Sequence, residues 1–246
     1  MSSLLPVASA AAVAYFALVQ QTALDTDSDA DRWRVRRRVL AASVLLYAVW
    51  FAYTYRDKHR TAVWGPSWAA RFAASVCHFI GWSCGLTLTV KFEEEAGLKA
   101  EHRGLVAAVG PHGVFPMAML GLGGFMFRRD SGYGVPGLID IEARFAGASI
   151  VFMAPVVREL LLLMGVRDAS RSTVRALLAS NHSVAIQPGG IWEMVMSDSS
   201  QEALYFQRSL GFVRLALEAG RPLLPCYSFG ENQVRTPQHR TAEVGG

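Results

Sequence analysis

A histidine in a turn of glycine and proline is the first candidate for chemistry. The apolar run LVAAV at 105–109 leads into Gly-Pro-His-Gly at 110–113, which places His112 just past the end of a buried strand. Imidazole titrates near neutral pH, so a histidine in this position can act as a general base. Glycine on both sides leaves room for a substrate. A turn histidine that only hydrogen-bonds its own loop gives the same pattern and is the alternative.

A second turn of this kind follows the apolar run SVAIQ at 183–187. Gly189 and Gly190 come next, and Glu193 stands shortly after them. A glycine pair lets backbone N–H groups face an anionic group or an oxyanion. The Glu193 carboxylate is then placed to orient a base or to contact a polar substrate group. The alternative is an ordinary glutamate in the first turn of a helix, favoured by the helix dipole.

A third turn follows the run PLLPCYSF at 222–229. Glu231 and Asn232 fall just past this strand, and we expect them in the same layer as the other two turns. A plain polar turn is the alternative. Ser228 is not in a Gly-x-Ser-x-Gly elbow, so the sequence does not indicate a hydrolase nucleophile there.

Cysteine content and net charge exclude several classes of protein. The chain has 246 residues, three cysteines and a formal charge of +4. Three cysteines exclude a disulfide framework, and Cys77, His78 and Cys84 lack the paired spacing of a zinc site, with Cys226 far away. We therefore expect free thiols and no metal. The small positive charge gives little support for a nucleic-acid partner.

Short apolar runs separated by glycine and proline must position these turns. Strands are expected at 105–109, 149–153, 183–187 and 222–229, and helices at 155–164, 172–180 and 204–219. Strands that alternate with helices predict an α/β domain with a mixed or mainly parallel sheet flanked by helices.

The hydrophobic excess lies near the N-terminus. Residues 4–19 and 39–55 form two uncharged runs, of which the first spans about 24 Å as a helix against a hydrocarbon core of about 30 Å. Basic residues stand on both sides of 39–55, so the positive-inside rule gives no single orientation. A membrane hairpin with both ends in the cytosol reconciles the two flanks. A buried core helix is the alternative.

A less apolar stretch joins this region to the predicted domain. Residues 68–90 mix apolar and polar positions in the manner of an interfacial segment, and 91–104 form a polar break. We therefore expect a membrane-embedded region at 1–60, an amphipathic connector at 61–104 and the catalytic domain at 105–246.

Several blocks in this order resemble the type 2 diacylglycerol acyltransferase and monoacylglycerol acyltransferase family. The blocks are GPHGVFP (110–116), VPGL (135–138), FMAPVVREL (152–160), SRSTVRALLASNHSVAIQPGGIWEM (170–194) and QRSLGFVRLALEAGRPLLPCYSFGEN (207–232). The resemblance implies a glycerolipid-acyltransferase-like fold behind an N-terminal membrane hairpin. It also implies transfer of an acyl group from acyl-CoA to a diacylglycerol or monoacylglycerol hydroxyl, with acyl-CoA as co-substrate and no other cofactor. An endoplasmic reticulum membrane, with the active site facing the cytosol, follows from it, and a homo-oligomer is a further expectation.

The resemblance also implies roles for single residues. His112 matches the second histidine of the family's His-Pro-His-Gly motif and is the expected base, with Glu193 as its first carboxylate partner and Glu231 as its second. Met117 stands where related acyltransferases carry an aspartate, which leaves Asp140 and Glu142 as remoter carboxylates. The expected substrate-binding residues are Pro111, Gly113, Gly189, Gly190, Arg208, Glu231 and Asn232. The CoA phosphates need cations, for which the candidates are Arg158, Arg167, Arg171 and Arg208.

Two departures from the family pattern keep alternatives open. Gly110 replaces the first histidine of the motif, and the family continues well past the Ser-Phe-Gly-Glu-Asn block. We therefore expect either a fragment of a longer family member or a C-terminally shortened member. An acyltransferase that makes wax esters from a long-chain alcohol is one alternative. A non-catalytic, lipid-binding relative is the other.

Overall fold

The computed structural model of the chain describes residues 29–55, 60–85, 87, 89–93, 98–113, 139–196, 203–206 and 210–231. Internal contacts divide the chain into two compact units, Met1–Lys58 and His59–Gly246.

The first unit contains one long described helix, α2 (Asp29–Tyr55). It begins ten residues before the predicted apolar run, so the arginine-rich stretch forms its first turns. Its C-terminal two thirds expose large apolar side chains, including Leu40, Leu45 and Val49. Of the helices described, α2 alone is long and apolar enough to cross a membrane, judged by length and composition. The other predicted arm, 4–19, lies outside the described residues.

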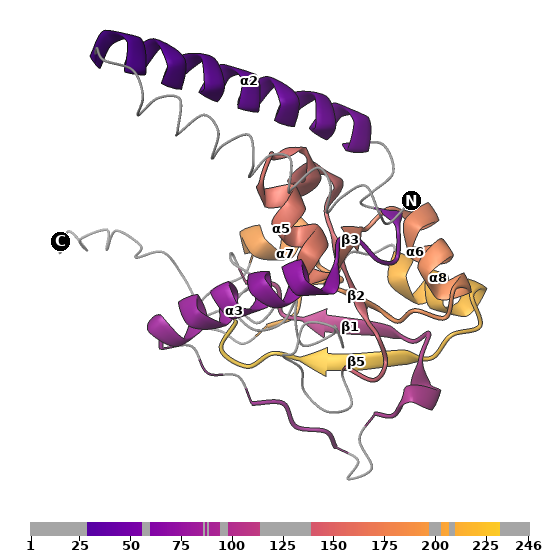
Figure 1. Ribbon diagram of the computed structural model, residues 1–246. Coiled ribbons are helices and arrows are strands. Elements are labelled where there is room, and N and C mark those ends of the chain that lie inside the picture. Colours follow the sequence, from indigo (N-terminus) through magenta and orange to yellow (C-terminus); the bar gives the residue numbers. More distant parts are fainter. Residues whose placement is uncertain are drawn as a thin grey trace, which may run out of the picture. The chain divides into compact units, whose positions relative to one another are not determined.

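The second unit is built on a five-stranded parallel sheet (Figure 1). Its strands are β1 (Val106–Gly110), β2 (Arg144–Gly147), β3 (Val166–Asp168), β4 (Val184–Ile186) and β5 (Leu223–Tyr227), in the order β3-β2-β4-β1-β5. Every neighbouring pair is parallel, and Val106 of β1 lies opposite Val184 on one side and Leu223 on the other. The predicted α/β class is confirmed, and the described sheet is parallel throughout.

Helices pack on the sheet in two pairs. Helices α6 (Arg171–Ala179) and α8 (Gly211–Glu218) contact each other and close the main core, where Val174, Leu178 and Leu215 meet the apolar side chains of β1 and β4. Helix α5 (Val157–Met164) joins β2 to β3, and this step along the sheet runs opposite to the step from β3 to β4 that contains α6. A right-handed crossover therefore places α5 on the other face of the sheet. Helix α3 (Ser67–Ser83) packs against α5.

Two buried arginines fasten the start of this unit to the sheet. Arg167 of β3 donates to the carbonyl oxygens of Thr61 and Ala62, and Arg144 of β2 donates from Nε to the Ala62 oxygen at 2.7 Å. Arg167 is fully buried, and Nη1 also donates to the carbonyl oxygens of Leu162 (2.9 Å) and Val166 (2.6 Å). The chain at 61–62 is therefore tied to β2 and β3.

The predicted elements agree with the structure except at two places. The expected strand at 149–153 is wrong: these residues form a 3-10 helix, η5 (Ser149–Met153), which buries Phe152 and exposes Ile150 and Met153. The strands on either side of it, β2 and β3, were missed because their charged residues break the apolar pattern. The helix expected at 204–219 begins only at Gly211, and residues 203–206 lie outside any helix.

Candidate active site

The imidazole of His112 is held by its own turn. Strand β1 ends at Gly110, a cis peptide bond leads to the buried Pro111, and His112 is half-buried just beyond. Nδ1 of His112 lies 2.7 Å from the carbonyl oxygen of Gly113. Because a carbonyl oxygen can only accept a hydrogen bond, Nδ1 carries the proton in this arrangement. In the neutral ring, Nε2 then carries no proton and keeps its lone pair. A general base requires this tautomer, because the lone pair accepts the proton.

Burial governs the protonation of this ring. It lowers the pKa of His112 below its ordinary value, while the hydrogen bond to Gly113 and the negative charge of Glu193 act in the opposite direction. The imidazole is therefore neutral at pH 7 and able to take a proton. The Glu193 charge thus favours the protonated form of the ring, against the larger effect of burial.

Glu193 is placed by the first turn of helix α7 (Gly190–Met196), which follows β4. Its side chain is only 1% exposed, and Oε1 accepts a hydrogen bond from the backbone N–H of Tyr205 at 3.1 Å. A buried carboxylate needs such a partner, because unpaired burial of a charge is costly. Glu193 is thus an oriented buried anion rather than a solvated helix-start glutamate.

Gly189 and Gly190 are glycines for different structural reasons. A Cβ on Gly189 would overlap Cβ and Oε2 of Glu193 and the carbonyl oxygen of Tyr205, so only glycine fits there. Gly190 has φ +53°, a left-handed conformation, and its N–H donates to the carbonyl oxygen of Gln187 at 3.2 Å. That N–H is therefore engaged within the turn. The close fit at Gly189 is what lets the Glu193 carboxylate lie against the strand end.

The turn after β5 packs directly on the histidine turn. A Cβ on Gly113 would lie 2.5 Å from the carbonyl oxygen of Glu231, and the Ser228 N–H donates to the Gly110 carbonyl oxygen at 2.7 Å. Glu231 is 5% exposed, and Ser228 Oγ lies 3.4 Å from its Oε2. The three predicted turns therefore meet at the carboxyl ends of β4, β1 and β5, which are adjacent in the sheet.

A fourth segment, residues 203–206, was not predicted to take part. Besides the Tyr205 N–H on Glu193, it brings Leu204 over the end of β1: a Cβ on Gly110 would lie 2.5 Å from Leu204 Cδ2. Gly110 is the position where the family motif carries its first histidine. In this chain the side chain of Leu204 occupies the space beside it, and the missing Cβ at Gly110 was the signal in the sequence that a neighbour approaches closely.

The remaining predicted site residues are either outside the described part of the chain or away from this edge. Arg208 and Asn232 are outside the described residues. Asp140 and Glu142 precede β2 at the amino edge of the sheet, where Arg103 pairs with the Glu142 carboxylate at 3.0 Å and donates to the Asp140 carbonyl oxygen. The strands are parallel, so these two carboxylates stand at the opposite edge from His112.

Two of the arginines expected to meet CoA phosphates are unavailable. Arg158 and Arg167 are both fully buried; Arg158 pairs with Glu159 at 2.8 Å, and Arg167 holds the backbone carbonyl oxygens described above. Arg171 is exposed and pairs with Glu218 at 2.5 Å. Buried guanidinium groups that already bind internal acceptors cannot reach a soluble phosphate.

Nucleophilic cysteine chemistry has no support at this edge. Burial raises the pKa of Cys226, on β5, to about 11, which keeps its thiol protonated at neutral pH. Within the described ranges, no group of three histidine, cysteine, aspartate or glutamate side chains could hold a metal ion. Among the described side chains, His112 and Glu193 are the candidates for acid–base chemistry at this edge.

Comparison with known sequences bears on this arrangement. The sequence model of the diacylglycerol acyltransferase family matches residues 38–243. Mouse diacylglycerol O-acyltransferase 2-like protein 6 is 29% identical over 201 residues, which cover 77% of this chain and 54% of the relative. Human diacylglycerol O-acyltransferase 2 is 37% identical over 129 residues, covering 50% of this chain and 32% of the relative. Human 2-acylglycerol O-acyltransferase 3 is 37% identical over 102 residues, which are 40% of this chain and 29% of that protein.

The chain thus spans about half or less of the length of these curated relatives. No solved structure matches it.

Proposed function

The chain belongs to the diacylglycerol acyltransferase family, and on that premise we propose that it transfers a fatty acyl group from acyl-CoA to the free hydroxyl of diacylglycerol or monoacylglycerol. The observation that carries the proposal is the His112 ring, whose Nδ1 is fixed on the Gly113 carbonyl oxygen and whose pKa is lowered by burial. A neutral imidazole with a defined tautomer is what a proton-abstracting base needs.

The proposed chemical step uses this geometry. Nε2 of His112 removes the proton from the acceptor hydroxyl as its oxygen attacks the thioester carbonyl carbon. The tetrahedral intermediate collapses, the carbon–sulfur bond breaks, and the imidazolium returns its proton to the CoA thiolate. The ester and free CoA are the products, and neither a covalent acyl-enzyme nor a cofactor beyond acyl-CoA is needed.

Glu193 has a positioning and electrostatic role in this proposal. Its buried carboxylate raises the pKa of His112, which means that it stabilises the imidazolium formed when the proton is taken. Glu231 braces the histidine turn from the other side through its contact with Gly113. A family member with a membrane-length helix fits an enzyme of the endoplasmic reticulum membrane whose site faces the cytosolic pool of acyl-CoA, and that location belongs to the proposal.

Expression in cells that lack storage-lipid synthesis tests the function. Labelled fatty acid should enter triacylglycerol or diacylglycerol with the unaltered chain and with His102→Ala, which removes an exposed histidine far from the site, but not with His112→Ala. Equal product from His112→Ala would refute the role of the histidine. Label in wax ester instead would change the acceptor to a long-chain alcohol, and no neutral lipid from any variant would favour a non-catalytic lipid-binding protein.

A further inference from the structure

Helix α3 carries its large side chains on the outside. Its buried face consists of small residues, namely Ala70, Ala73, Ala74, Cys77 and Gly81. Its exposed residues Trp68, Phe72, Val76, Phe79 and Trp82 recur at intervals of three or four and form one stripe. Phe72 is 69% exposed and Trp82 70%. Packing on α5 explains the small residues and leaves the aromatic stripe without a partner among the described parts of the chain.

The carboxyl edge of the sheet is also apolar on its outside. Directly after β2, η5 exposes Ile150 and Met153; after β4, α7 exposes Trp192 and Val195; and Phe229, which follows β5, is 84% exposed. Helix α7 therefore turns Glu193 inward to the site and Trp192 outward. Single exposed apolar residues are ordinary, but several large ones gathered at one edge of a sheet indicate an interaction surface.

The amino edge of the sheet has the opposite character. Its connections carry ion pairs and polar contacts: Arg103 with Glu142, Arg175 with Glu218, and Arg221 with Asn181. These ion pairs and polar contacts gather at the amino edge, whereas most of the large exposed apolar side chains named above lie at the edge that holds His112.

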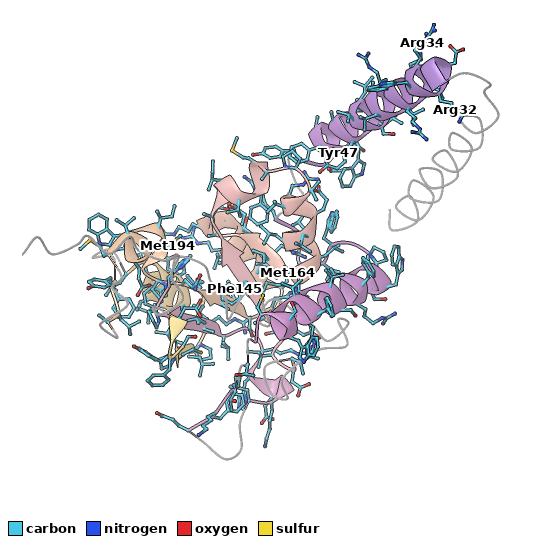
Figure 2. The ribbon with its side chains drawn as sticks, turned by 90° about the vertical axis from the view of Figure 1, so that its left-hand side faces the viewer. Arg32, Arg34, Tyr47, Phe145, Met164 and Met194 are labelled. Carbon is cyan, nitrogen blue, oxygen red and sulfur yellow. The ribbon has the colours of Figure 1, made fainter. Side chains whose placement is uncertain are left out.

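The two figures show how α3 and α7 lie with respect to the strands. In Figure 1 the arrowheads of β1 and β5 point to the left, and α3 runs in the same direction. Figure 2 turns that side to the viewer and shows α3 on one flank and α7, marked by Met194, on the other. The chain just before α3 lies near the C-terminal end of α5, since a Cβ on Gly65 would lie 2.7 Å from Leu163 Cδ2. The C-terminal end of α3, which carries Phe79 and Trp82, therefore extends toward the active-site edge.

The chain itself indicates what covers this surface. Residues 56–60 are all that separate α2, the candidate membrane helix, from Thr61, which Arg167 ties to β3. A bilayer that holds α2 is therefore within reach of the second unit. Helix α3 has no acidic residue, and tryptophans stand near both of its ends, as in segments that lie at a membrane–water interface.

We propose that the exposed stripe of α3 and the apolar carboxyl edge (Ile150, Met153, Trp192, Val195 and Phe229) dock on a lipid bilayer, which seats the His112 site at the interface. Docked in this way, the site can receive the acyl acceptor sideways from the bilayer, and this consequence rests on the proposed function. The docking itself is a property of the surface and does not need turnover.

A labelled full-length chain tests the docking. Cys77, Cys84 and Cys226 are replaced by alanine, and one new cysteine carries an environment-sensitive fluorophore. Phe72→Cys and Trp192→Cys place it on the apolar surface. Leu217→Cys is the matched control, because Leu217 is 76% exposed near the end of α8, which leads to the amino end of β5. Each chain is reconstituted into phosphatidylcholine vesicles that contain a spin-labelled phosphatidylcholine as quencher.

We expect the lipid-borne quencher to reduce fluorescence at 72 and 192, where the labels should sit roughly 5–10 Å into the headgroup boundary. Aqueous iodide should quench the label at 217 and spare the other two. Equal lipid quenching at all three positions, or none at 72 and 192, overturns the proposal. Energy transfer between two labelled chains at 72 without lipid quenching would mean that a second copy covers the surface, and it also overturns the proposal.

A kinetic comparison separates docking from chemistry. In the double variant Phe72→Ser, Phe79→Ser we expect KM for a vesicle-embedded acceptor to rise roughly tenfold with kcat retained, because two phenyl groups no longer enter the bilayer. Leu217→Ser should leave both constants unchanged. A chain that docks but makes no ester refutes only the proposed function. A chain that makes ester without lipid quenching at 72 and 192 refutes only the docking.

Discussion

At the scale of single residues, Gly110 and Leu204 pack closely together at the site. The missing side chain at 110 leaves the space that Leu204 Cδ2 fills above the end of β1. The replacement of the motif's first histidine is therefore matched by an apolar residue from a distant part of the chain. His112 and its hydrogen bond to Gly113 do not depend on that lost histidine.

Gly110→Ala tests this pairing. Its Cβ would lie 2.5 Å from Leu204 Cδ2, so we expect a loss of stability of about 1–3 kcal/mol together with reduced activity. Leu204→Ala alone should be milder, because Leu204 is partly exposed. The double variant should recover activity relative to Gly110→Ala. Measured stabilities and rates that simply add would contradict the coupling.

Glu193→Gln tests the electrostatic role of the buried carboxylate. The Glu193 charge raises the pKa of His112, so its removal lowers that pKa further, and the base stays deprotonated to lower pH. We expect the acid limb of the pH profile of kcat/KM to move to lower pH while the maximal rate falls. The amide oxygen still accepts the Tyr205 N–H, which preserves the fold. An unchanged acid limb would show that the Glu193 charge does not influence the pKa of His112.

The residue pattern predicted part of this site. Three strand-end turns with glycine were expected at one edge of a sheet, and the structure brings His112, Glu193 and Glu231 together there. It did not predict Tyr205, because that residue contributes a backbone N–H, which every residue except proline possesses. It also offered Arg167 as a phosphate ligand, since no pattern in the sequence distinguishes a buried arginine from an exposed one.

At the scale of elements, the two strands on either side of η5 contain buried charged residues, which hide them from a search for apolar runs. Strands β2 and β3 contain Arg144, Arg167 and Asp168, all buried and all hydrogen-bonded; Ser149 Oγ, for example, donates to Asp168 Oδ1 at 2.5 Å. Searching for apolar runs passes over such strands. It selects 149–153 instead, where Phe152 is buried but Ile150 and Met153 face outward. The fully apolar strands β1 and β4 were found because nothing polar interrupts them.

Arg167→Lys tests the fastening of residues 61–62. Lysine places one ammonium where a guanidinium serves several carbonyl oxygens, and each buried acceptor left unpaired costs about 1–3 kcal/mol. We expect the free energy of unfolding to fall by at least about 2 kcal/mol in detergent solution, measured by urea denaturation. Arg171→Lys, at an exposed ion pair, is the control and should change it by less than about 1 kcal/mol. Similar losses in both variants would show that the buried network is unimportant.

At the scale of the whole molecule, α2 is expected to hold the protein in the membrane. Leu46 is an exposed apolar residue in the apolar part of that helix, and an arginine at a membrane-helix centre costs about 2.5–3.5 kcal/mol. Leu46→Arg should therefore increase the fraction of protein that alkaline carbonate releases from membranes, whereas Leu46→Ala should not. Complete retention of the arginine variant would argue against insertion of α2.

The division of the second unit into a charged amino edge and an apolar carboxyl edge has a kinetic consequence. An enzyme seated by its apolar edge samples acceptor molecules that diffuse in two dimensions, so its rate follows the mole fraction of acceptor in the surface rather than the amount of acceptor per volume. Adding inert phospholipid at constant acceptor would then slow the reaction by surface dilution. Dilution of the whole suspension would not.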